Sequence, residues 1–242
     1  MAKLQDIIQW CDQTLKSTEF KDYAPNGLQI EGKTEVRKIL AAVTASQDAI
    51  DAAIRENADL LLVHHGYFWK GEAYPITGMR GKRIKSLIQH DISLLAYHLP
   101  LDSHPSLGNN AAIADLLKLE RIEALDPSER HPIGNIGYLK QPMPVEEFKT
   151  FVSEKLKFDV THLPADKTMI EKVGFCTGGA QDFIVKAAEQ GCDAYISGEV
   201  SERTFYEAKE LDVHYFACGH HATERYGCLL YTSDAADDMQ CV

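Results

Sequence analysis

The sequence predicts an α/β protein made of two related, duplicated halves, in which mixed sheets are flanked by helices. Short apolar runs without alternation, such as residues 60–63, are typical of strands that are buried on both faces of a sheet. Amphipathic helical patterns separate these runs along the chain, which indicates helices that cover a sheet. An internal repeat is the third observation, because it relates the first half of the chain to the second.

Composition excludes several kinds of partner. The 242 residues are 45% hydrophobic, which is enough for a globular protein to bury a core. The formal net charge is −11, with 25 Lys and Arg against 36 Asp and Glu, so we expect neither nonspecific nucleic-acid binding nor binding to anionic membranes. No apolar stretch approaches the ~20 residues of a membrane span, and the first residues do not resemble a signal peptide. We therefore expect a soluble, cytoplasmic protein.

The six cysteines are scattered along the chain and form no C-x-x-C pair. Several lie in apolar runs, where a free thiol behaves as a small hydrophobic side chain. We therefore expect neither structural disulfides nor a cysteine zinc site.

The first half spans residues 1–125. Helices are predicted where apolar residues recur every three or four positions, and strands where apolar residues alternate with polar ones or run without interruption. A turn signal at residues 25–27 and an N-cap at Ser46 mark the ends of elements. In chain order we expect a helix at about 3–16, strands at 28–31 and 39–43, a helix after Ser46, a strand at 60–63, a helix at 80–90, a strand at 92–97 and a helix capped by Asn109 or Asn110.

The second half spans residues 126–227 and follows a stretch, at 125–132, that is rich in proline, serine and charge. In chain order we expect a strand at 136–139, an amphipathic helix at 145–156, a loop at 162–167, a strand ending near Cys176, an apolar strand at 215–218 and a helix after Gly219. Residues 228–242 lack the pattern of a further helix and strand. We expect them to form an atypical, truncated or misread C-terminal tail.

The two halves are related by a repeat with an offset of 134 residues. This offset aligns Asp59 with Asp193, and it lays the histidine pair at 64 and 65 over residues 198 and 199. Ligands of such sheets collect where strands end, and equivalent strand ends of two related halves can face each other across a shared cleft. We therefore expect a metal site in the cleft between the halves.

Polar clusters that can hold a metal ion fall at the predicted strand ends. They lie at residues 64–65, 98–102, 197–199 and 219–224. Adjacent residues of a strand point in different directions, so His64 and His65 are expected to serve two different ions. His220 and Glu224 are four residues apart, which places both side chains on one face of a helix.

Each cluster also has a plain structural interpretation. His64 and His65 could be hydrogen-bonded histidines near a core. Glu224 could interact with the dipole of a helix N-terminus while the neighbouring histidines pack locally. The aromatic loop at residues 66–71 could pack over the sheet edge or stack against a substrate.

The clusters together offer a mixed nitrogen and oxygen donor set. It comprises His64, His65, Asp102, His220 and Glu224. Such a set suits Zn, Fe, Mn, Co or Ni rather than Ca or Mg, and it leaves positions for water, as in a catalytic centre. Two ions about 3.5–4 Å apart can bridge and deprotonate a water, so hydrolysis is the expected reaction class. Residues expected to orient the ligands or to contact a substrate are His98, His104, Glu199 and His221.

Five motifs in order along the chain resemble those of a known family. They are NGLQ at 26–29, VHHG at 63–66, HLPLD at 98–102, ISGE at 196–199 and GHHATE at 219–224. Over about residues 1–227, the chain is similar to the GTP cyclohydrolase 1 type 2 family, also called the NIF-three-like family of dinuclear metal-binding proteins, and above all to its enterobacterial member.

The resemblance implies a duplicated α/β fold, two divalent transition metal ions per chain and a toroidal homohexamer whose metal sites face an internal cavity. It also implies that the metal ligands are His64, His65, Asp102, His220 and Glu224. Among these, Glu224 is implied to bridge the two ions.

Two functions follow from these expectations. The first is a metal-dependent hydrolase that activates a metal-bridging water against a nucleotide-like or other small heterocyclic substrate. The alternative is a non-catalytic metal-binding regulatory or scaffold protein, whose ring matters more than turnover. The first predicts activity that needs metal, whereas the second predicts metal content and assembly without catalysis.

Overall fold

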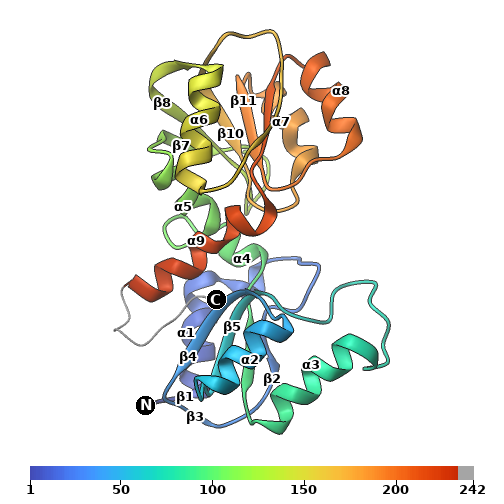
Figure 1. Ribbon diagram of the computed structural model, residues 1–242. Coiled ribbons are helices and arrows are strands. Elements are labelled where there is room, and N and C mark those ends of the chain that lie inside the picture. The colour runs from blue at the N-terminus through green and yellow to red at the C-terminus, as the bar shows by residue number, and fades with distance from the viewer. Residues whose placement is uncertain (234–242) are drawn as a thin grey trace. The chain divides into compact units, whose positions relative to one another are not determined.

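A computed structural model describes residues 1–233, and the chain forms two compact units. The first unit is Met1–Leu101 with the described residues from Gly227 onward, and the second is Asp102–Tyr226. Each unit has its own sheet, flanked by its own helices (Figure 1).

The boundary between the units lies earlier than the predicted one at residue 125. α5 (Asn109–Leu116) and β7 (Glu120–Ala124) belong to the second unit. The physical reason is that β7 pairs with β8 (Asn135–Pro144) and that Ile113 of α5 packs in the core of the second unit. The stretch rich in proline and charge is therefore a loop between two paired strands, not a linker between units.

A four-stranded mixed sheet forms the centre of the first unit. Its elements are α1 (Leu4–Leu15), β2 (Gly27–Ile30), β4 (Ile39–Thr44), α2 (Gln47–Arg55), β5 (Leu60–His65), α3 (Gly78–Gln89) and β6 (Ser93–Ala96). The strand order is β2-β6-β5-β4, with β4, β5 and β6 parallel and β2 antiparallel at one edge. β1 (Ala2–Lys3) and β3 (Glu35–Val36) form a separate antiparallel pair, and Ser17–Glu19 is a single 3-10 turn.

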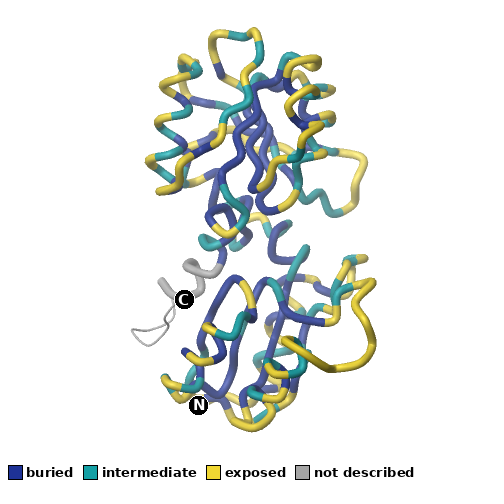
Figure 2. The backbone as a smooth tube through the Cα atoms, turned by 45° about the vertical axis from the view of Figure 1, so that its right-hand side comes forward, coloured by how far each residue is buried: buried dark blue, intermediate teal, exposed yellow. Residues whose placement is uncertain are grey.

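Both faces of this sheet are buried, as the apolar run at residues 60–63 predicts. Leu61 packs with Ile50 of α2 and Leu87 of α3 on one face. Leu60 packs with Leu15 of α1 on the other face. Figure 2 shows these strands as largely buried, whereas residues 70–77 between β5 and α3 are all exposed.

One predicted helix cap is confirmed and one is wrong. The Ser46 hydroxyl accepts the backbone N–H of Ala49 at 3.2 Å at the start of α2. α5 instead starts after Gly108, and no side chain caps it. Asn109 and Asn110 do not act as the cap, because both side chains are hydrogen-bonded to Asp102, which follows Leu101 in the short helix α4 (Leu99–Asp102).

A six-stranded mixed sheet forms the centre of the second unit. Its further elements are α6 (Val145–Leu156), β9 (Thr161–Leu163), β10 (Met169–Phe175), the 3-10 turn Gln181–Phe183, α7 (Ile184–Glu189), β11 (Ala194–Ser197), α8 (Glu202–Glu210) and β12 (His214–Ala217). The strand order is β7-β8-β10-β11-β12-β9, with β10, β11 and β12 parallel. The predicted loop at residues 162–167 is partly wrong, because β9 pairs antiparallel with β12 there.

The two sheets repeat one topology, which explains the repeat in the sequence. In each unit a helix and an antiparallel edge strand precede three parallel strands that are joined by two helices. The helices also cover equivalent faces: Phe148 of α6 packs on one face of the second sheet, and Ile184 of α7 packs on the other. α1 corresponds in this way to α6, and β4, β5 and β6 correspond to β10, β11 and β12.

An aspartate hydrogen-bond network is repeated at the offset of 134 residues. Asp59 accepts the backbone N–H groups of Arg37 and Lys38 and the ammonium of Lys33. Asp193 likewise accepts the backbone N–H groups of Glu171 and Lys172 and pairs with the ammonium of Lys167. Every partner is displaced by 134 positions, so the alignment of Asp59 with Asp193 has a structural counterpart in matching hydrogen bonds.

The C-terminal helix α9 (His220–Ser233) begins in the second unit. It continues past Cys228, where the sequence did not predict further helix, because adding a residue to an existing helix is far easier than nucleating one. The rest of the predicted atypical tail, residues 234–242, lies outside the described residues. In the part of the chain that the structure describes, no helix combines the length and apolarity needed to cross a bilayer.

Candidate metal centre

In the first unit, β5 ends in the two adjacent histidines. The Nδ1 atom of His64 lies 2.9 Å from the carbonyl oxygen of Tyr97. A carbonyl only accepts hydrogen bonds, so Nδ1 carries the proton and the lone pair of His64 lies on Nε2. The Nδ1 atom of His65 lies 3.2 Å from the hydroxyl of Thr44 on the neighbouring strand.

The two rings diverge less than alternation along a strand predicts. Their centroids are 4.5 Å apart and their planes are inclined by 40°. The reason is local, because β5 ends at His65 and the chain bends at Tyr67. His64, His65 and His98 each have one ring nitrogen that lies within 4.8 Å of the ring nitrogens of the other two. These three histidines therefore form a group that can hold a metal ion.

His98 follows β6 and is held by an acidic side chain that the sequence did not single out. Its Nδ1 atom lies 2.7 Å from Oδ1 of Asp22. The other oxygen of Asp22 accepts the backbone N–H of Leu99 and the amide of Asn26. Burial alone would raise the pKa of Asp22, but the hydrogen bonds and the charge of His98, with the two other donors, lower that pKa to about 2. Asp22 is therefore ionised and can only accept a proton from His98.

The NGLQ motif supports the other motifs of the first unit. The side chain of Asn26 accepts the backbone N–H of His98 at 2.8 Å. The side chain of Gln29 accepts the backbone N–H of Tyr67 at 2.7 Å and donates to the Tyr67 carbonyl at 3.1 Å. A Cβ atom at Gly66 would lie 2.2 Å from Oε1 of Gln29, so only glycine fits this turn.

The aromatic loop packs partly against the histidines. The Trp69 ring meets the His98 ring edge to face at 4.9 Å, and its centroid lies 5.8 Å from that of His65. The indole N–H of Trp69 donates to the Gly66 carbonyl, and the buried Tyr67 hydroxyl donates to the Ala45 carbonyl. These contacts fit the structural interpretation of the loop up to Trp69.

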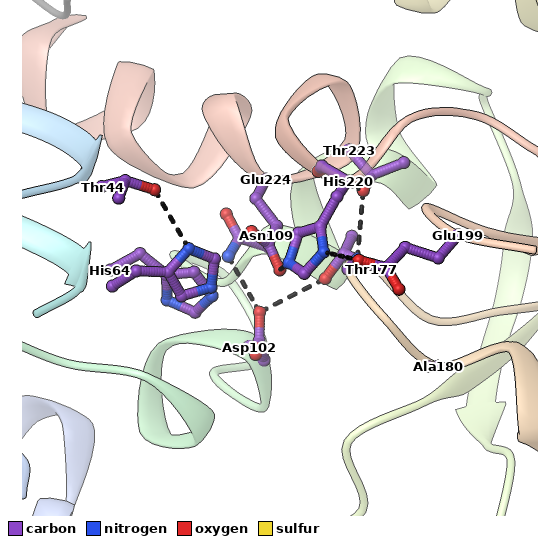
Figure 3. Close-up of polar contacts among 12 residues, drawn as sticks. Thr44, His64, Asp102, Asn109, Thr177, Ala180, Glu199, His220, Thr223 and Glu224 are labelled. Atoms are coloured by element: carbon purple, nitrogen blue, oxygen red, sulfur yellow. Dashed lines mark hydrogen bonds and ion pairs between the residues drawn. The ribbon is translucent and has the colours of Figure 1, made fainter. Parts of the chain in front are cut away.

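In the second unit, two buried carboxylates come together. Asp102 accepts hydrogen bonds from the amide of Asn109 at 2.8 Å and the hydroxyl of Thr177 at 3.2 Å (Figure 3). A carboxylate oxygen of Asp102 lies within 4.8 Å of one of Glu224, and the two residues are only 6% and 2% exposed. Like charges at this separation in a buried setting favour a cation beside them.

His220 and Glu224 lie on one face of α9, as their spacing predicts. Nε2 of His220 is 3.1 Å from Oε1 of Glu224, and Nδ1 is 2.7 Å from Oε1 of Glu199 (Figure 3). The hydrogen bond to Glu224 is the largest cause that raises the pKa of His220, to about 9, against the opposing effect of burial, and Glu199 contributes further. This position therefore favours positive charge, and a metal ion would have to displace the proton.

A glycine makes room for the Glu224 carboxylate. Gly178 has a φ of +70°, and a Cβ atom there would lie 2.2 Å from Oε1 of Glu224 and 3.1 Å from Nε2 of His220. Its backbone N–H donates to the hydroxyl of Thr223, which in turn donates to the carbonyl of His220. The oxygen and nitrogen donors, and the space left for them by Gly178, fit a divalent transition metal ion.

Of the residues predicted to orient the ligands or contact a substrate, Glu199 lies beside a predicted ligand, whereas His104 makes a local contact and His221 is exposed. Glu199 is hydrogen-bonded to His220. His104 accepts the backbone N–H of Leu107 at 3.0 Å, which is a local contact within its own loop. His221 is exposed on α9. Burial raises the pKa of the Cys176 thiol well above its ordinary value, and Asp102 and Glu224 add to the rise, so Cys176 is a poor thiolate ligand.

Several residues that position these side chains were missed from the sequence. They are Asp22, Asn26, Asn109, Thr177 and Thr223. Signals were available for two of them, since Asn26 belongs to the NGLQ motif and Thr223 to the GHHATE motif. Asn109 has the sequence context of a helix cap, and Asp22 and Thr177 are single polar residues in segments without a distinctive pattern.

Known proteins are similar to this chain in sequence and in fold. The family model of Duf34/NIF3 (NGG1p interacting factor 3) matches residues 2–238. A protein of Haemophilus influenzae called "GTP cyclohydrolase 1 type 2 homolog" is 51% identical over 224 residues, which cover 92% of this chain and 88% of the relative. Its namesake in Vibrio cholerae is 52% identical over 220 residues, covering 89% and 86%.

Solved structures share the fold along the whole chain. A structure titled "Structural genomics, protein ybgI, unknown function" is 42% identical with a TM-score of 0.93, covering 100% of this chain and 98% of that chain. A protein from Thermus thermophilus is 28% identical with a TM-score of 0.87, covering 100% and 97%. The family suggested by the five motifs is thus confirmed, and the chain belongs to the Duf34/NIF3 (NGG1p interacting factor 3) family.

Proposed function

We propose that this protein is a dinuclear metal-dependent hydrolase, which acts on a nucleotide-like or other small heterocyclic substrate. The observation that carries the proposal is the oriented donor set of the second unit. The Nδ1 atom of His220 is 2.7 Å from the carboxylate of Glu199, and the buried carboxylates of Asp102 and Glu224 lie within 4.8 Å of each other. A carboxylate–histidine pair of this kind fixes the tautomer and the ring orientation of a metal ligand.

The proposed ligands of the two ions are His64 and His65 from the first unit, and Asp102, His220 and Glu224 from the second. Glu224 is proposed as the bridge, because it is buried and lies close to both Asp102 and His220. The mixture of imidazole and carboxylate favours Zn, Fe, Mn, Co or Ni.

The two ions, when bound, would acidify a bridging water and stabilise negative charge on a carbonyl or phosphoryl oxygen. The chain's own residues keep the ligands in their reactive form. The Tyr97 carbonyl holds the proton of His64 on Nδ1, and Asn109 and Thr177 fix the Asp102 carboxylate. Glu199 accepts the Nδ1 proton of His220, which leaves Nε2 for the metal.

Location and assembly belong to the same proposal. The acidic net charge of −11 disfavours anionic surfaces, in keeping with a cytoplasmic protein that acts on a small molecule. We also propose that the chain assembles with copies of itself into a toroidal homohexamer, as the family resemblance implies.

A panel of nucleotides and other heterocycles tests the hydrolase directly. Release of formate or phosphate should require added metal and should be lost in Glu224→Ala. Glu210→Ala is the matched control, because it removes an exposed glutamate, in α8, from the same unit. The proposal fails if turnover persists after complete metal removal, or if Glu224→Ala retains the full metal-dependent rate.

A non-catalytic regulatory or scaffold role is the second candidate. The family description, "NGG1p interacting factor 3", favours it, because it names an interaction and not a reaction. The two candidates differ in one result: two bound ions and a stable ring, with no turnover on a broad panel, would support the scaffold.

A further inference from the structure

The first unit brings together three imidazoles, of which the proposed metal centre uses two. The His98 ring centroid lies 5.1 Å from that of His64 and 5.7 Å from that of His65. A ligand nitrogen of each of the three rings lies within 4.8 Å of the others. His98 thus faces both histidines that end β5.

The orientation of His98 is fixed by a buried network. The Asp22 side chain is 3% exposed, and its Oδ1 atom binds Nδ1 of His98 at 2.7 Å. Its Oδ2 atom accepts the backbone N–H of Leu99 at 2.9 Å and the amide of Asn26 at 2.9 Å. Asn26 also binds the backbone of His98 at 2.8 Å. A carboxylate only accepts here, so the proton lies on Nδ1 and the lone pair of His98 lies on Nε2.

The second unit contains the counterpart of this arrangement. His98 is the second residue after β6, and His220 is the third residue after the equivalent strand β12. His220 is likewise bound through Nδ1 to a carboxylate, Glu199, at 2.7 Å. The duplicated units therefore place an acid-oriented histidine at the same end of the same strand.

We infer that His98, held by Asp22, is a further protein ligand of the metal centre, so that the first unit supplies three imidazole nitrogens. This inference rests on the metal centre proposed above. It changes the chemistry of that centre, because three nitrogen donors in one unit favour Zn²⁺, Co²⁺, Ni²⁺ or Fe²⁺ more strongly over Mg²⁺ and Ca²⁺.

Cobalt binding provides the test, because the visible spectrum of Co²⁺ responds to the number and type of its ligands. In the full chain, His98→Ala should alter this spectrum and weaken at least one of two bound ions in competition with a chelator. Asp22→Asn should weaken binding about 10–100-fold while retaining the His98 ring. In that variant the amide N–H₂ can donate to Nδ1, which moves the histidine proton to Nε2 and blocks the lone pair.

His90→Ala is the matched control, since His90 is an exposed histidine of the same unit, bound to the Ser86 carbonyl. It should leave spectrum and affinity as in the parent. Circular dichroism and thermal melting of the metal-free variants show whether each one folds. The inference is overturned if folded His98→Ala binds two Co²⁺ ions with the parent spectrum and affinity, a result that leaves the proposed function standing. A parent that binds no Co²⁺ overturns both.

Discussion

Replacing Gly178 by alanine puts a methyl group where the Glu224 carboxylate lies. The new Cβ atom would be 2.2 Å from Oε1 of Glu224 and 3.1 Å from Nε2 of His220. The carboxylate must retreat to about the 3.4 Å of ordinary contact. Ligand distances in metal sites are tolerated only to roughly 0.2 Å, so a displacement of this size should disrupt the ligand.

The backbone adds a second, separable effect. Gly178 has a φ of +70°, where a residue with a Cβ atom is disfavoured by roughly 1–2 kcal/mol. Gly191 has a φ of +69°, and a Cβ atom added there would meet no atom of a non-adjacent residue within 4 Å. Gly191→Ala therefore carries the backbone strain without the clash, and it is the matched control.

Urea unfolding of the metal-free proteins and chelator competition for Zn²⁺ measure the two effects. Gly191→Ala should lose about 1–2 kcal/mol of unfolding free energy and bind Zn²⁺ as the parent does. Gly178→Ala should lose at least as much stability and bind Zn²⁺ at least about tenfold more weakly. Parent-like Zn²⁺ binding by Gly178→Ala would refute the assignment of Glu224 as a ligand held beside this glycine.

Two further predictions concern stability. Asp59→Ala and Asp193→Ala should each reduce the free energy of unfolding by about 2–4 kcal/mol in urea denaturation, because each substitution leaves equivalent backbone N–H donors without an acceptor. Effects that differ widely between the two variants would count against equivalent roles of these aspartates in the two units. Burial, and then His214, lower the pKa of His162 below its ordinary value of 6.5. As the pH falls, His162 is therefore protonated in the unfolded chain before it is protonated in the folded one, so the free energy of unfolding should fall as the pH drops through 6.5. This loss should be smaller in His162→Gln, and equal losses of unfolding free energy in the parent and the variant between about pH 7.5 and 5.5 would contradict the prediction.

The parallel strands of the first sheet and the helices that cover it follow from local patterns. The run at residues 60–63 is apolar throughout because helices cover both faces of its sheet, so burial alone identifies the strand. The two edge strands of the second sheet, β7 and β9, carry no such signal. The residues of β7 are mostly exposed, and β9 is short and partly exposed, so neither has a continuous apolar run.

The proposed ligands were predictable because their chemistry is concentrated in short motifs at strand ends. Their supporting residues were not, because their roles depend on contacts between distant segments. Asp22 is 76 positions from His98, and Thr177 is 75 positions from Asp102. Asn109 has the sequence context of a helix cap, yet its amide binds a buried carboxylate instead. The helix-capping preference of asparagine favours Asn109 as a cap, but a hydrogen bond to the buried Asp102 oxygen stabilises the fold more than the cap would.

The central claim is a centre of two metal ions per chain, and metal content measures it most directly. The parent protein should be saturated with Zn²⁺ or Co²⁺, desalted and analysed by mass spectrometry of the metals together with the protein concentration. Two ions per chain are predicted, with a clear loss in Glu224→Ala and no loss in the control Glu210→Ala. Fewer than one ion per chain in the folded, metal-saturated parent would contradict the claim.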